Sequence, residues 1–193
     1  MSPDDNLYAF VFRASLAQGS VDRELSKSTP PAGDAAGRIA ERMPMDLLDK
    51  DLVASALKMA HVYTAIAAFE NSARKFIQDR MLEEVGANWW ATNVSQTIRS
   101  EADRRKKDED QIRWHGTRGA SMIYFTQLAD LVTIMQNNIV MFQNHIESID
   151  WARQIFKSLE RSRNVIMHSG ELSMNDMERV AMNIRDWLRQ VGG

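Results

Sequence analysis

Apolar residues recur at intervals of three and four residues along most of the chain after position 45. This spacing puts apolar side chains on one face of an α-helix. Glycine and proline are scarce in the same region, and runs of β-branched residues are few. The pattern predicts an all-α fold built as a helical bundle.

The apolar periods and the breaks between them divide this region into expected helices. The first stretch is longer than one typical helix, so we expect a short helix followed directly by a long one. Near the end of the chain, Asp150 is a candidate N-cap, Gly170 suits a left-handed C-terminal cap, and Ser173 with Asp176 resembles a capping box. The expected helical stretches are 47–85, 92–108, 121–134, 138–147, 151–168 and a final helix that follows Ser173.

The first 45 residues differ from the rest. Residues 7–17 are apolar enough for a short helix or a docking arm, whereas 19–37 are small, polar and proline-containing, as in a loop or mobile linker. We therefore predict an N-terminal arm and flexible linker over 1–45 and one helical domain over 46–193.

The composition excludes several classes of site. The chain has no cysteine, so disulfides, thiolate zinc sites and cysteine nucleophiles are ruled out. A net charge of −2 argues against a wholly basic nucleic-acid coat but leaves room for a local basic patch. We expect no membrane span, because no apolar run approaches the roughly 18 residues that a span needs. The acidic start lacks the basic region of a secretory signal, so we expect a cytoplasmic protein.

The stretch RNVIMHSG, residues 163–170, interrupts the most regular apolar stripe. Ala152, Ile155, Phe156 and Leu159 share one helical face, but the next step of that face falls near Arg163. An unpaired buried charge is very costly. Arg163 must therefore find a partner or line a cleft.

Two more polar residues follow Arg163. Asn164 and His168 are four residues apart and share a neighbouring helical face, whereas roughly 140° separates Arg163 from His168 on a straight helix. The two side chains converge only if the arginine bends across, if the helix loosens before Gly170, or if a second chain completes the site.

An arginine and a histidine together suit RNA cleavage. RNA carries its own nucleophile, the 2′-hydroxyl beside the scissile phosphate. A histidine can remove that proton or protonate the leaving oxygen, and an arginine can hold the phosphate with two hydrogen bonds. The alternative is a structural arginine paired with a buried acid, next to a histidine at a helix end.

Several stretches resemble the HEPN superfamily (higher eukaryotes and prokaryotes nucleotide-binding). Arg163, Asn164 and His168 match its motif of arginine, a polar residue and a later histidine. The stretch AFENSARKFI, residues 68–77, resembles the first core helix of the branch that includes the C-terminal domain of a nuclear RNA-surveillance endonuclease and many bacterial defence proteins. The stretches NWW (88–90), QLADLVTI (127–134) and HSGELSMNDMERV (168–180) extend the resemblance over about 60–191.

The resemblance implies a bundle of four to five core helices and a metal-independent endoribonuclease. It implies that Arg163, Asn164 and His168 are catalytic and that two copies form a homodimer with a shared active site. A toxin or phage-defence context, with an antitoxin or regulatory protein partner, is also implied. The alternative within the superfamily is a non-catalytic module that binds RNA, a nucleotide or a protein.

Other polar residues are secondary candidates. Glu70 and Arg74 form either a simple intrahelical pair or a group that orients Arg163 or His168. Arg104, Arg105, Lys106 and Lys107 could contact RNA phosphates, although the following Asp-Glu-Asp nearly cancels their charge. His115 lies in a glycine-containing loop that could border an RNA path. No metal-ligand spacing or nucleotide-binding fingerprint is present, so we expect no metal and no cofactor.

Overall fold

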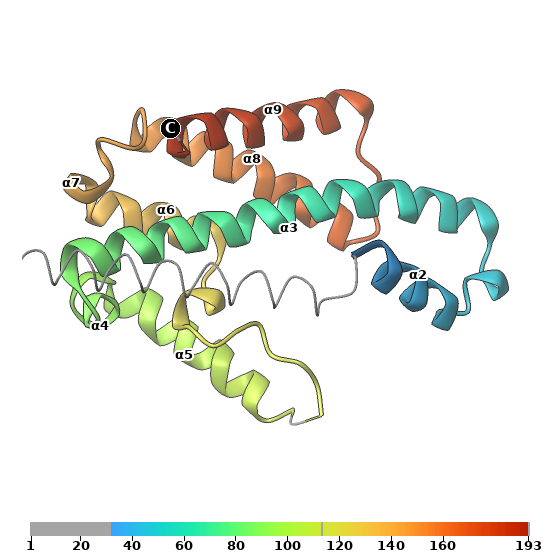
Figure 1. The fold of residues 1–193 in the computed structure, drawn as a ribbon, viewed down its shortest axis with the longest axis horizontal. Coiled ribbons are helices and arrows are strands. Elements are labelled where there is room, and N and C mark those ends of the chain that lie inside the picture. The colour runs from blue at the N-terminus through green and yellow to red at the C-terminus, as the bar shows by residue number, and fades with distance from the viewer. Residues whose placement is uncertain (1–31, 113, 193) are drawn as a thin grey trace, which may run out of the picture. The chain divides into compact units, whose positions relative to one another are not determined.

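A computed structural model describes residues 32–112 and 114–192, and within them the chain is all-helical, as the apolar pattern predicts (Figure 1). The chain divides into two compact units, the second of which runs from Ala54 to Gly193. The elements in order are α2 (Ala32–Arg42), η1 (Met45–Leu47), α3 (Lys50–Val85), α4 (Trp89–Asn93), α5 (Gln96–Asp110), η2 (Met122–Phe125), α6 (Leu128–Asn137), α7 (Ile139–Phe142), α8 (Ile149–Met167) and α9 (Met174–Val191).

The N-terminal expectations are met only in part. The arm predicted over 7–17 lies outside the described residues. The loop predicted over 19–37 is wrong at its end, because α2 begins at Ala32. Its stretch Ala32–Arg42 contains four alanines, which are the best helix formers, and these outweigh the two glycines.

The long apolar stretch forms one helix rather than two. Helix α3 is continuous over 36 residues, and only the 3₁₀ turn η1 precedes it. By length and composition α3 could cross a membrane, and it is the only helix of residues 32–112 and 114–192 that could. The expectation that no stretch is long and apolar enough is therefore wrong. Only 17% of that apolar window is buried inside the structure, whereas the second half of α3 buries Ala73 and Ile77 in the bundle.

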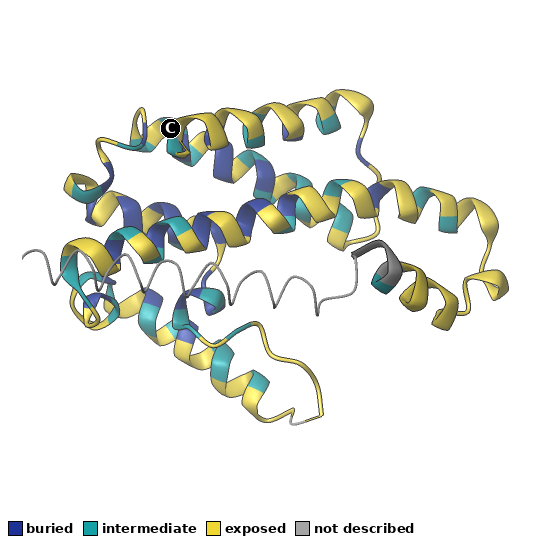
Figure 2. Ribbon diagram, viewed as in Figure 1, coloured by how far each residue is buried: buried dark blue, intermediate teal, exposed yellow. Residues whose placement is uncertain are grey.

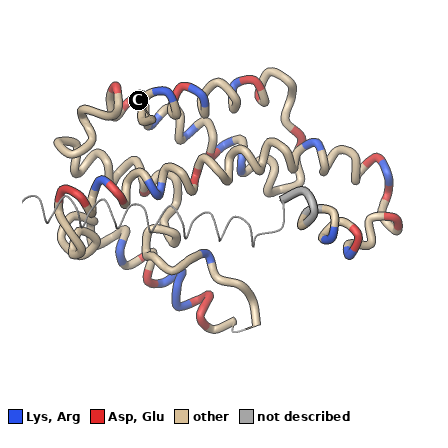
Figure 3. Tube along the Cα trace, viewed as in Figure 1, with Lys and Arg blue, Asp and Glu red and all other residues tan. Residues whose placement is uncertain are grey.

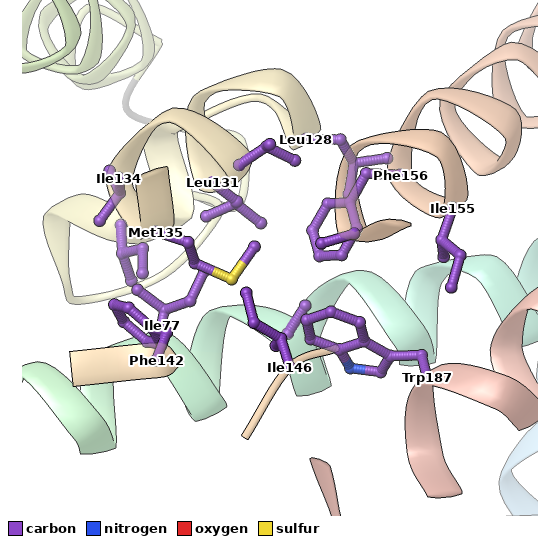
Figure 4. Packing of buried hydrophobic residues seen from close by; sticks show 14 of the residues in the cluster. Ile77, Leu128, Leu131, Ile134, Met135, Phe142, Ile146, Ile155, Phe156 and Trp187 are labelled. Carbon is purple, nitrogen blue, oxygen red and sulfur yellow. The ribbon is translucent and has the colours of Figure 1, made fainter. Parts of the chain in front are cut away.

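The core of the second unit lies between α3, α6, α8 and α9 (Figures 2 and 4). Trp187 of α9 is fully buried, and its ring contacts Phe69 of α3 and Phe156 of α8 with centroid distances of 5.9 and 5.0 Å. Trp151 stacks on the same ring, with centroids 5.8 Å apart. Edge-to-face and stacked contacts of this kind stabilise aromatic clusters. They fix α8, and with it Arg163, against α3.

Two predicted helices are interrupted where polar side chains bind the backbone. The stretch 121–134 breaks after η2, because Asp130 accepts a hydrogen bond from the backbone nitrogen of Gln127 at 2.8 Å and starts α6 anew. The stretch 138–147 is helical only as α7. There the Asn138 amide donates to the carbonyl oxygens of Ile134 and Asn93, at 2.8 and 3.1 Å. Local bonds of this type compete with helix continuation.

The helix ends differ in detail from those expected. Ser95 caps a separate helix α5, so the stretch 92–108 is split. The N-cap of α8 is Ser148 and not Asp150. At the end of α8, Ser169 takes the left-handed conformation with φ of 60°, and Gly170 follows it. The capping box of Ser173 with Asp176 at the start of α9 is confirmed.

Candidate functional site

Arg163 lies on the face of α8 that turns toward α3. Its side chain is 23% exposed, and its Nη1 donates to the Glu70 carboxylate at 3.3 Å (Oε1) and 3.2 Å (Oε2). The arginine that interrupts the apolar stripe therefore has a charged partner on the neighbouring helix. Both sequence-based expectations for it hold, because it also lines a cavity.

The Glu70 carboxylate accepts hydrogen bonds from two arginines, Arg163 and Arg74. Its Oε1 accepts a hydrogen bond of 2.5 Å from Arg74 Nη2, one turn further along α3. Arg74 also donates to the carbonyl oxygen of Thr126 at 3.1 Å and to Asn71 Oδ1 at 3.2 Å. Glu70 and Arg74 are both buried. One carboxylate shared by two guanidinium groups leaves this buried cluster positively charged.

Asn164 continues the cluster toward solvent. Its Oδ1 accepts a hydrogen bond from Arg163 Nη2 at 3.3 Å. A guanidinium group only donates, so the side-chain oxygens of Asn164 and Asn71 face their arginines. The amide nitrogens of both asparagines remain as donors. The cluster therefore offers donors to a ligand that is rich in acceptors.

These residues line a cavity of about 520 Å³. Three arginines and one glutamate supply its charge, and the buried Arg74 Nε has no hydrogen-bond partner among the described residues. An excess of arginine in a partly enclosed space favours an anion, and arginine binds phosphate particularly well. The lining residues are Tyr63, Ala67, Glu70, Asn71, Arg74, Arg118, Tyr124, Thr126, Gln127, Arg163, Asn164 and Met167.

His168 lies outside this lining. It is the C-cap of α8, it is exposed, and its backbone nitrogen donates to the carbonyl oxygen of Asn164 at 3.1 Å. Within one chain, therefore, Arg163 and Asn164 line the cavity and His168 does not. This agrees with the wide angle that separates the two side chains on a helix.

The loop after His168 is held on the first half of α3. Glu171 accepts hydrogen bonds from Lys58 Nζ at 2.8 Å and from Ser55 Oγ at 3.1 Å. The bond from Lys58, followed by that from Ser55, holds the pKa of the Glu171 carboxyl below its usual range. A side chain at Gly170 would lie 2.7 Å from Val165 Cγ1, so the loop needs glycine there to fold back on α8.

The basic cluster of α5 is largely paired with acids, and charges of both signs lie along the helix (Figure 3). Arg104 bridges Glu101 and Asp108, and Lys106 pairs with Asp110 at 2.9 Å. Arg105 is only 14% exposed and donates to the carbonyl oxygen of Phe125 at 2.8 Å. Lys107 is exposed and makes no ion pair with another described residue. None of the four lines the cavity.

The loop between α5 and η2 reaches the cavity through a residue that the sequence analysis did not select. His115 is exposed, with Nδ1 3.0 Å from the carbonyl oxygen of Gly116, and it does not line the cavity. Arg118 of the same loop does. The glycines on either side of Arg118 marked the loop in the sequence, but which of its basic residues turns inward depends on contacts with α5 and η2.

Within residues 32–112 and 114–192, no three histidine, aspartate or glutamate side chains gather as ligands for a metal ion.

Comparison with known families identifies the domain. The model of the Swt1-like HEPN family matches residues 64–192, which is about two thirds of the chain and includes Glu70, Arg74, Arg163 and His168. No curated protein and no solved structure matches the chain.

Proposed function

Because the chain belongs to the Swt1-like HEPN family, we propose that it is a metal-independent endoribonuclease whose reaction depends on Arg163 and His168. Family membership supports a nuclease or RNA-related role for the domain. The catalytic activity itself, and the part that each residue takes in it, are our proposal.

The observation that carries this proposal is the cavity beside Arg163. It contains three arginines for one glutamate, and the remaining amide groups of Asn71 and Asn164 are donors. Such a surface suits the oxygens of a phosphodiester. His168 follows one turn after Asn164, at the end of the same helix. An imidazole is the side chain that gains and loses a proton most readily near neutral pH.

In the proposed reaction, Arg163 binds the scissile phosphate and Asn164 donates a further hydrogen bond. His168 acts as the general acid or base. The proton leaves the 2′-hydroxyl, the 2′-oxygen forms a bond to phosphorus, and the bond from phosphorus to the 5′-oxygen breaks. The leaving 5′-oxygen takes up a proton, so the products are a 2′,3′-cyclic phosphate and a 5′-hydroxyl. Arg163 stabilises the negative charge that grows on the phosphate oxygens.

We place the complete site between two chains. Arg163 and His168 diverge on α8, and the cavity of one chain does not include His168. Apolar side chains next to the motif are exposed, among them Met167 (61%) and Met174 (61%), and exposed apolar groups of this kind favour an interface. A two-fold axis near the end of α8 would bring His168 of one chain to the cavity of the other.

The biological setting is inferred from the resemblance to HEPN defence proteins. In a toxin or phage-defence role, an antitoxin or regulatory protein would restrain the nuclease. The alternative function is a non-catalytic HEPN module that binds RNA, a nucleotide or a protein. The position of His168 outside the cavity of its own chain favours this alternative.

Cleavage of RNA in EDTA separates these functions. Matched substitutions are His168→Ala with His61→Ala as control, and Arg163→Ala with Arg161→Ala as control, since His61 and Arg161 are exposed and lie outside the cavity lining. We expect cleavage by the unmodified protein and both controls, and its loss in His168→Ala and Arg163→Ala. RNA binding without cleavage by the unmodified protein would favour the alternative. Cleavage that survives both substitutions would remove these residues from the mechanism.

A further inference from the structure

Arg118 is fixed in the loop between α5 and η2 by one acidic residue. Glu109 of α5 accepts a hydrogen bond from the backbone nitrogen of Arg118 at 3.1 Å, and its other oxygen lies 2.5 Å from Arg118 Nε. The terminal nitrogens of Arg118 make no hydrogen bond to another described residue. They remain available to a ligand in the cavity that Arg118 lines.

The loop also packs closely against Tyr124, which lines the cavity. Gly119 lies so close to Tyr124 that a side chain there would be 2.8 Å from the Tyr124 ring. The ring of Tyr124 in turn lies 5.9 Å from Arg74 Cζ, in a cation–π arrangement. The position of Arg118 is therefore connected, through Gly119 and Tyr124, to the arginines that share Glu70.

The same loop carries the most exposed tryptophan among the described residues. Trp114 is 86% exposed, and its described ring contact is with His115, with ring centroids 5.7 Å apart. An exposed indole is costly to leave in water, and it is a good stacking surface for an unpaired base. Trp114 and Arg118 lie four residues apart, with His115, Gly116 and Thr117 between them.

The cavity is larger than one phosphate requires. At about 520 Å³ it falls in the range of sites for small organic ligands. Arg163 of α8 and Arg118 of the loop both line this cavity, so guanidinium groups from two separate elements face a ligand there. Trp114 lies in the same loop as Arg118, and an indole stacks only on a base that is unpaired.

We infer that residues 114–120 of this loop bind single-stranded RNA, with Arg118 on a phosphate that neighbours the scissile one and Trp114 stacked on a base. This inference rests on the proposed function and adds the strandedness of the substrate. It assigns RNA contacts to Arg118 and Trp114, in place of the basic residues of α5.

The test is equilibrium binding of a short 2′-O-methyl oligoribonucleotide of mixed sequence, as a single strand and as a duplex, over a series of salt concentrations. The 2′-O-methyl group removes the nucleophile, so binding is measured whether or not the protein cleaves RNA. The variants are Arg118→Gln and Trp114→Ala. Their controls are Arg179→Gln and Val140→Ala, which change an exposed arginine and an exposed apolar residue elsewhere.

The two variants should differ in their salt dependence. Arg118→Gln should weaken binding of the single strand and reduce the slope of log K against log salt concentration by about 0.7, the value for one phosphate contact. Trp114→Ala should weaken binding about tenfold at every salt concentration and leave the slope unchanged. The duplex should not respond to Trp114→Ala. Glu109→Gln and Gly119→Ala keep Arg118 but disturb its position, so both should weaken binding.

Binding by Arg118→Gln and Trp114→Ala that equals that of the controls would overturn the inference, and so would the absence of any binding by the unmodified protein. If the unmodified protein cleaves RNA but the loop variants bind normally, the inference fails and the proposed function stands. If binding depends on the loop but no RNA is cleaved in EDTA, the proposed function fails and the RNA-binding loop stands.

Discussion

Glu70 on α3 and Arg163 on α8 are joined by a hydrogen-bonded ion pair, with Arg163 Nη1 3.2 Å from Glu70 Oε2. The pair connects the first core helix of the domain to the helix that carries the Arg163–His168 motif, 93 residues later in the chain. Arg74 Nη2 donates to Oε1 of the same carboxylate. Glu70 is therefore a positioning residue for Arg163 in the proposed mechanism.

Replacement of Glu70 by glutamine should reduce both stability and cleavage. The side chain keeps its length, but Arg74 and Arg163 lose the negative charge that they share. Loss of a hydrogen bond to a buried charged group costs about 1–3 kcal/mol of unfolding free energy. Chemical denaturation and RNA cleavage measure the two effects, with the exposed Glu178→Gln as control. A Glu70→Gln protein as stable and active as the control would contradict the role of the pair.

A site shared between two chains predicts complementation. Arg163→Ala and His168→Ala should each be inactive alone. When the two are mixed and allowed to exchange subunits, each mixed dimer contains one site with both residues. Random pairing should then restore about a quarter of the unmodified activity. If Arg163 and His168 of the same chain act together, mixing restores nothing.

The Glu171 interactions predict a pH dependence of stability. Lys58 and Ser55 hold the pKa of Glu171 below its usual range in the folded chain. Their contribution is therefore present above the ordinary carboxyl pKa and is lost as the pH falls through the lowered value. The difference in Tm between the unmodified protein and Glu171→Gln should be greatest near neutral pH and disappear in acid. A difference that is constant between pH 7 and pH 3 would exclude this cause.

The basic residues of α5 should contribute little to RNA binding. Lys106 is already paired with Asp110, and neither Lys106 nor Lys107 lines the cavity. The double variant Lys106→Gln, Lys107→Gln should weaken binding of single-stranded RNA less than Arg118→Gln alone. Filter-binding or anisotropy measurements at one low salt concentration are sufficient. A larger loss in the double variant would place the RNA path along α5.

The all-α class and the importance of Arg163 could be predicted from the sequence, because both follow from the spacing of apolar residues along the helices. The interrupted stripe of α8 selected Arg163, and the i,i+4 spacing on α3 selected Glu70 and Arg74. That Glu70 is the partner of Arg163 could not be read from the spacing, since their contact depends on how α3 packs against α8. The aromatic cluster around Trp187 determines that packing.

Two predicted helices and one predicted loop contact differ from the structure for a common physical reason. Helices 121–134 and 138–147 were predicted from apolar periodicity, but Asp130 and Asn138 bind backbone groups and end the helical runs. Likewise, His115 was selected from its loop, whereas Arg118 faces the cavity because Glu109 and Tyr124 fix the loop. Hydrogen bonds from side chains to the backbone, and contacts between distant segments, are difficult to predict from a single sequence.

In the proposed reaction the RNA supplies the attacking 2′-hydroxyl, and the domain cleaves it without a metal ion. The most direct measurement is end-group analysis of RNA that the purified protein has cut in the presence of EDTA. We expect 2′,3′-cyclic phosphate and 5′-hydroxyl ends, together with resistance of a substrate in which every 2′-hydroxyl is methylated. Ends with a 3′-hydroxyl and a 5′-phosphate, or cleavage of the methylated substrate, would contradict it.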